Sequence, residues 1–118
     1  KTGKIEKISI KKESLMGGMS CGEVSLVPWQ ILKNSVSHCV TVSDDNISKT
    51  VKFLANCEFS DEKIIGGECS TPGIISLIGL CNDLKIRKKI DLNEDSNVLL
   101  FGCEGDADEE LYQKLLSL

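Results

Sequence analysis

The chain has 118 residues, of which 41% are hydrophobic and 27% are charged, and its net charge is -4. This balance is typical of a globular domain and excludes both a disordered chain and a membrane-embedded one. A nucleic-acid partner is disfavoured, because the chain has an acidic excess and only one Trp and one Tyr for base stacking. Its apolar stretches are far shorter than the roughly 20 residues that span a bilayer, and no signal segment opens it, so we expect a cytoplasmic protein without membrane contact.

Residues 1–15 form a lysine-bearing lead-in, and we interpret residues 1–118 as a single partial domain. Because the sequence opens on Lys1 and not on Met, we expect a fragment of a longer polypeptide. The six cysteines form no CxxC pair, so we predict no metal site and mostly reduced thiols, buried as small hydrophobic groups. They are Cys21, Cys39, Cys57, Cys69, Cys81 and Cys103.

A first helix is predicted after the glycine-rich residues 16–22, ending near residues 34–37. Pro28 falls in its first turn, where the missing N–H is tolerated. The apolar residues recur at helical spacing, at Val24, Val27, Ile31 and Leu32. The β-branched run 38–42 then predicts a short buried strand.

A second helix follows that strand. Ser43 is expected to cap it. One face of the helix is apolar, at Ile47, Val51 and Leu54. After a polar loop, residues 63–65 form a plausible second strand.

The third helix begins at Thr71 and Pro72, with Thr71 as N-cap and Pro72 as the first helical residue. It is apolar on nearly every side, so we expect another part of the protein to cover it. A charged connection leads to residues 97–101, an apolar run typical of a strand in a parallel sheet. A last helix carries Leu111, Leu115 and Leu118.

This alternation of strands and helices predicts an α/β fold, a mostly parallel sheet with flanking helices. In such a sheet, ligands bind at the carboxyl ends of the strands. The loops 66–70 and 102–106 follow the second and third predicted strands. Both loops are therefore candidates for a binding site.

A simpler interpretation applies to each loop taken alone. Ser70 or Thr71 could merely cap the third helix, and Asp106 or Asp108 could cap the last one. Capping does not account for the carboxylate and the thiols that the loops also carry.

Four stretches, in order, resemble diaminopropionate ammonia-lyases, members of the tryptophan-synthase-β-like class of pyridoxal-phosphate (PLP) enzymes. They are residues 16–23 with 29–33, residues 51–56, residues 67–69 and residues 104–106. The resemblance runs from about Gly17 to Asp108. It implies that the chain is the C-terminal part of such an enzyme and belongs to its large domain.

The resemblance also implies a reaction. In this class a lysine holds PLP as a Schiff base, and α,β-elimination from the amino-acid substrate 2,3-diaminopropionate gives pyruvate and ammonia. The class places that lysine and its phosphate-binding loop in regions that this sequence lacks. We therefore assign no catalytic residue, and we expect the chain to be inactive without the remainder of its polypeptide. The family also implies a homodimer.

Four residues correspond to cofactor neighbours of the class. Glu68 matches a glutamate beside the cofactor ring, and Cys69 stands where relatives often have Ser. The group that faces the ring nitrogen falls on Gly102 or Cys103. Since Gly102 has no side chain, the weak S–H donor of Cys103 is the expected partner.

Two other interpretations stay open. The chain could be a free-standing α/β binding or regulatory module that kept the fold and lost catalysis. It could also be a fragment similar to serine and threonine dehydratases, which share the pattern of strands and helices but match less closely around residues 21–23 and 104–106.

Overall fold

The computed structural model describes residues 4–118, so residues 1–3 of the predicted lead-in lie outside the described residues. The chain divides into two units, of which the first ends at Thr41 and the second begins at Val42. The first unit contains the 3-10 helix η1 (Gly17–Met19) and the helix α1 (Leu26–Ser35). The second unit contains the remaining described helices and both candidate loops.

Helix α1 confirms the first predicted helix, and it begins two residues before Pro28. A proline is tolerated there because the first N–H groups of a helix have no partner within the helix. No residue of α1 is buried, and Val27 remains 72% exposed. The apolar spacing thus predicted the helix correctly, while its apolar side is left uncovered.

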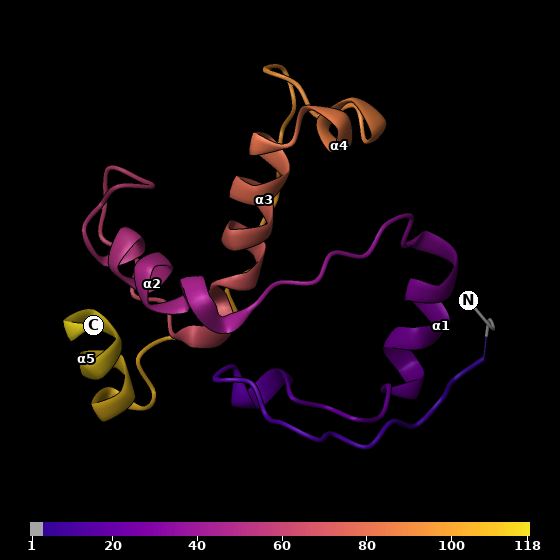
Figure 1. The fold of residues 1–118 in the computed structure, drawn as a ribbon, viewed down its shortest axis with the longest axis horizontal. Coiled ribbons are helices and arrows are strands. Elements are labelled where there is room, and N and C mark those ends of the chain that lie inside the picture. The colour runs from indigo at the N-terminus through magenta and orange to yellow at the C-terminus, as the bar shows by residue number, and fades with distance from the viewer. Residues whose placement is uncertain (1–3) are drawn as a thin grey trace. The chain divides into compact units, whose positions relative to one another are not determined.

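The core of the second unit forms where α2 (Ile47–Ala55) packs against α5 (Glu109–Ser117), and the two helices lie side by side in Figure 1. The predicted apolar face of α2 is buried, with Ile47 and Val51 at 0% exposure and Leu54 at 2%. Burial of each such side chain stabilises the folded state by about 1.5–3 kcal/mol. This face is the main reason why α2 is fixed in place.

Helix α5 contributes Tyr112 and Leu115 to the same core. The Ser48 hydroxyl of α2 donates a hydrogen bond to the Leu115 carbonyl at 2.6 Å, which ties the two helices together. The helix begins with a side-chain cap, because Asp108 Oδ1 accepts a hydrogen bond from the Leu111 amide at 2.9 Å. Capping by Asp108 confirms one of the two alternatives for this loop.

A short 3-10 helix, η2 (Asp44–Asn46), precedes α2, and Ser43 occupies its N-cap position. The Ser43 hydroxyl donates to the Asp45 carboxylate at 2.8 Å and makes no side-chain cap bond. The prediction that Ser43 caps the second helix is therefore wrong, because the N-cap residue of α2 is Asn46 and Ser43 stands only before η2.

Helix α3 (Pro72–Asn82) begins at the predicted proline, and Thr71 is its N-cap residue. The Thr71 hydroxyl donates to the Glu68 carbonyl at 2.7 Å, so it stabilises the preceding 3-10 helix η3 (Glu68–Ser70). Only Ile74 of α3 is buried. The other residues of this apolar helix are partly or fully exposed among the described residues.

One helix was not predicted: α4 (Leu84–Lys89) forms within the charged connection after α3. Asp83 caps it, since its Oδ1 accepts from the amides of Lys85 and Ile86 at 2.9 and 3.0 Å. The basic residues of the last turn face the negative end of the helix dipole. An Asp directly before the first helical residue was the signal that could have predicted α4.

The predicted parallel sheet is wrong. Between residues 4 and 118 the structure contains helices and irregular segments, with no strand. The three predicted strands, 38–42, 63–65 and 97–101, have no regular secondary structure. Their β-branched and apolar residues favour an extended chain locally, but a strand also requires a neighbouring segment that pairs with its main chain. Within residues 4–118, these three segments do not form strands that pair through main-chain hydrogen bonds.

The prediction of buried cysteines is wrong for five of the six, since only Cys69 is buried. The other thiols lie on the surface because the segments that carry them have few packing partners here. No helix in the described part of the chain is long and apolar enough to cross a membrane.

Candidate functional site

The two candidate loops lie against each other, although no sheet brings them together. The Gly67 amide donates to the Glu104 carbonyl at 3.1 Å. The Cys103 thiol donates to the Cys69 carbonyl at 3.3 Å. Main-chain and side-chain hydrogen bonds therefore hold residues 67–70 and the segment 102–106 together without the predicted sheet.

Ser70 makes the closest link between the loops. Its hydroxyl donates to the Glu104 carbonyl at 2.6 Å, and its oxygen accepts from the Glu104 amide at 3.0 Å. Both polar main-chain groups of Glu104 are thus satisfied by one buried side chain. The sequence marked Ser70 only as a possible helix cap, because its partner Glu104 lies 34 positions away.

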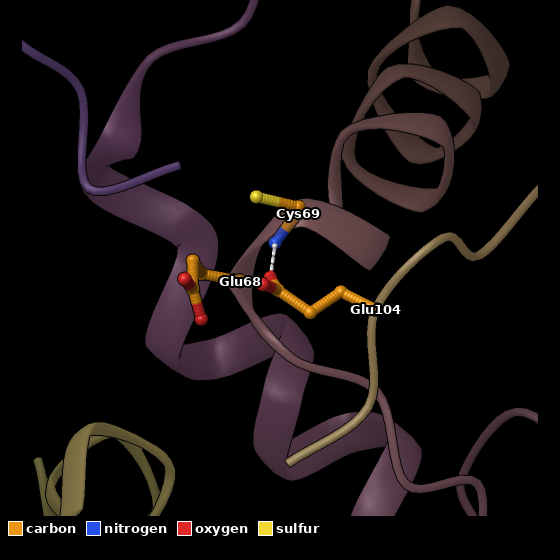
Figure 2. Close-up of side chains that lie close together, drawn as sticks. All are labelled: Glu68, Cys69 and Glu104. Carbon is orange, nitrogen blue, oxygen red and sulfur yellow. Dashed lines mark hydrogen bonds between the residues drawn. The ribbon is translucent and has the colours of Figure 1, made fainter. Parts of the chain in front are cut away.

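The Glu104 side chain also contacts the first loop. Figure 2 shows its side chain reaching from its own segment to the η3 turn, where one carboxylate oxygen, Oε2, accepts a hydrogen bond from the Cys69 amide at 3.1 Å. The carboxylates of Glu68 and Glu104 and the thiol of Cys69 each offer an atom within 4.8 Å of the others. The structure thus brings the predicted residues Glu68 and Cys69 together with Glu104, which belongs to the second candidate loop but was not among the four predicted cofactor neighbours.

Three glycines lie at this junction. A Cβ atom on Gly67 would collide with the Gly105 carbonyl oxygen and would lie 3.1 Å from the Glu104 side chain. A Cβ on Gly66 would lie 3.3 Å from Ser70 Cβ, and one on Gly102 would lie 3.4 Å from Ser70 Oγ. Gly67 is therefore required by the closeness of the two loops, whereas a Cβ on Gly66 would crowd residues outside the second loop and one on Gly102 would reach only ordinary van der Waals contact.

A pocket of about 230 Å³ opens beside this junction. Its apolar walls include Leu54, Phe59, Ile64, Ile74, Leu100 and Phe101. Ser70, Glu104 and two glycines complete the lining, which contains no Lys or Arg. Of the four predicted cofactor neighbours, Gly102 lines the pocket, whereas Glu68, Cys69 and Cys103 are not among the lining residues.

Tyr112, close to the second loop, has an unusual environment. Burial raises the pKa of its hydroxyl above 10.0, and the negative charge of Asp106 raises it further. The hydroxyl oxygen is buried and has no hydrogen-bond partner among the described residues. Both effects keep the hydroxyl protonated.

Nearly all of this chain aligns with part of a known enzyme. It is 27% identical over 117 residues to the diaminopropionate ammonia-lyase of Escherichia coli strain K12, and the match covers 97% of this chain and 29% of the relative. The diaminopropionate ammonia-lyase of Salmonella typhimurium strain LT2 is 25% identical over 107 residues, covering 87% of this chain and 26% of the relative. No protein-family model matches the chain. By sequence, this chain is therefore related to a part of diaminopropionate ammonia-lyases.

Proposed function

We propose that this chain is the C-terminal part of a PLP-dependent ammonia-lyase that converts 2,3-diaminopropionate to pyruvate and ammonia. The observation that carries the proposal is its similarity, over 97% of its residues, to 29% of a diaminopropionate ammonia-lyase. The residues that bind the cofactor covalently would belong to the remainder of that polypeptide. The chain alone would then be inactive.

Exposed apolar side chains support the idea of a larger protein. Leu99 is 77% exposed, Phe101 is 80% exposed, and Ile78 of α3 is 47% exposed. Large apolar side chains exposed to this extent are candidates for contact with another polypeptide. We propose that the remainder of the lyase covers these residues.

The pocket fits one part of a PLP cofactor. Its apolar walls suit the flat ring, but no cationic side chain lines it to bind the phosphate group. When bound, PLP draws electrons away from the α-carbon of the substrate, which allows the β-amino group to leave. The phosphate would be bound by residues of the remaining polypeptide.

The residues of this chain would act as one wall of the site. Gly102 brings the main chain to the pocket, and the neighbouring Cys103 thiol is held by the Cys69 carbonyl at 3.3 Å. An S–H group is a weak donor, so this bond costs little to exchange for one to a ring nitrogen. Glu68, on η3, does not line this pocket, so it would act on the ring only from the neighbouring turn.

The substrate test uses the full-length protein that carries this chain, loaded with PLP. Pyruvate or 2-oxobutyrate is followed through lactate dehydrogenase and NADH, with 2,3-diaminopropionate, serine and threonine as substrates. We expect the largest kcat/KM with 2,3-diaminopropionate. A preference for serine or threonine would indicate a dehydratase, and no turnover of any of the three would indicate a binding module.

A second measurement tests the inactivity of the chain alone. PLP is added to the isolated 118-residue chain, and the visible absorption band of a lysine Schiff base is recorded. We expect no such band. A strong band would show that one of the present lysines binds the cofactor, contrary to the proposal.

A further inference from the structure

Ser70 is buried at the junction of the two loops, with 7% of its surface exposed. Its hydroxyl bonds both the carbonyl and the amide of Glu104, although the two residues are 34 positions apart in the sequence. These two bonds fix the main chain of Glu104 with respect to η3. No other described side chain bonds both of these main-chain groups.

The surroundings of Ser70 leave little choice of side chain. Gly66 lies on one side and Gly102 on another, and a Cβ atom on either would come within 3.4 Å of the serine side chain. A larger residue at position 70 would therefore push the two main-chain segments apart. Alanine would fit, but it would leave the part-buried Glu104 amide without the acceptor that Ser70 supplies.

The effect of Ser70 reaches the predicted cofactor neighbours through Glu104. Cys103 directly precedes Glu104, and its thiol bonds the Cys69 carbonyl. The Glu104 carboxylate bonds the Cys69 amide. If Glu104 moved away from η3, Cys103 would lose its position relative to Cys69, and Glu104 would lose its position relative to Glu68.

We propose that Ser70 is a positioning residue: its hydroxyl holds the segment 102–105 against η3, so that Glu104 keeps its place beside Glu68 and Cys103 keeps its contact with Cys69. The importance for catalysis rests on the proposed lyase function. The positioning of the segment 102–105 by Ser70 does not depend on that function, and it can be measured without any turnover of substrate.

The test compares Ser70→Ala with Ser48→Ala in the full-length protein. Ser48 is a matched control, because its hydroxyl also donates to a main-chain carbonyl of a distant segment at 2.6 Å, away from the loops. The rate of alkylation of Cys69 by iodoacetamide is measured by peptide mass spectrometry, with exposed Cys57 as internal reference. Because Cys69 is 4% exposed, its alkylation reports local opening.

We expect Ser70→Ala to accelerate alkylation of Cys69 by about tenfold or more, the effect of losing roughly one to two buried hydrogen bonds. Ser48→Ala should leave the rate within about twofold of the wild type. Equal rates in the two variants would overturn the proposal.

Hydrogen exchange of the wild-type protein keeps the test decisive if Ser70→Ala does not fold. The Glu104 amide donates a hydrogen bond to the Ser70 oxygen, whereas the Gly105 amide has no acceptor among the described residues. The Glu104 amide should therefore exchange much more slowly than the Gly105 amide. Equally fast exchange at both amides would contradict a stable junction.

A last comparison separates positioning from simple stability. With PLP bound to the full-length protein, we expect protection of Cys103 from alkylation to be retained in Ser48→Ala and reduced in Ser70→Ala. Retained protection and unchanged kcat/KM in Ser70→Ala would overturn the role in the site. Absence of turnover in the wild type would count against the proposed lyase function, and the Cys69 rates would still decide the role of Ser70.

Discussion

Glu104 Oε2 accepts a hydrogen bond from the Cys69 amide at 3.1 Å, across 35 positions of sequence. The bond places a carboxylate at the η3 turn that leads into α3. A negative group is favourable there because the N–H groups at the start of a helix are exposed and carry partial positive charge. The Glu104 side chain thus acts as a cap supplied from a distant segment.

Substitution of Glu104 should separate charge from hydrogen bonding. Glu104→Ala removes the acceptor, and we expect a loss of about 1 kcal/mol in the free energy of unfolding. Glu104→Gln retains a carbonyl oxygen that can accept from Cys69, so its loss should be less than half as large. Urea unfolding followed by circular dichroism gives both values. Equal losses would show that the charge, and not the hydrogen bond, is the important term.

Gly67 should not tolerate a side chain. In Gly67→Ala the new Cβ would collide with the Gly105 carbonyl and press on Glu104, which we expect to cost about 1–3 kcal/mol. Gly105→Ala is the matched control, because a Cβ there meets nothing within 4 Å. Its effect should stay within about 0.5 kcal/mol. Urea midpoints of the two variants decide the point, and a reversed order would contradict the observed approach of the loops.

Gly79 lies inside α3, and a Cβ at this position would meet nothing within 4 Å. In the isolated chain, Gly79→Ala should therefore stabilise the fold by about 0.5–1 kcal/mol, since alanine favours a helix more than glycine does. A thermal melt would show an increase of a few degrees.

The same substitution in the full-length protein tests whether α3 is covered. If the remainder of the lyase packs closely on this helix, the added methyl group should give no stabilisation or a loss. A gain in both proteins would argue that the side of α3 that carries Gly79 faces solvent.

Ionisation of Tyr112 should lower the stability of the folded protein at alkaline pH. Its folded pKa is raised above 10.0, by burial first and by Asp106 second, so the folded state retains the phenolic proton more firmly than the unfolded state. The resulting stability is fully present below pH 10 and is lost as the pH rises through the folded pKa. Since the chain has one Tyr, its absorbance at alkaline pH follows this residue alone.

Tyr112→Phe should remove that alkaline sensitivity. The hydroxyl has no hydrogen-bond partner among the described residues, so its removal should be neutral or slightly stabilising near neutral pH. Unfolding measured at pH 7 and pH 10.5 tests this. A clear loss of stability at pH 7 would mean that the hydroxyl has a partner in solution.

The sequence by itself determined most of the helices. The apolar spacing of α2 and the Thr71–Pro72 start of α3 are local signals, because helical hydrogen bonds join residues close in sequence. It also marked the two loops that meet in the structure. The missed helix α4 had a local signal too, in the side chain of Asp83.

Only the tertiary structure decided the arrangement of the segments 63–65 and 97–101 and of the site itself. Apolar, β-branched residues predicted strands, but strand pairing depends on segments that the local pattern does not specify, and here no strand forms between residues 4 and 118. The importance of Ser70 was likewise hidden, because its hydrogen bonds go to a residue 34 positions away. Contacts of that kind depend on where the folded chain returns, which spacing within one segment does not determine.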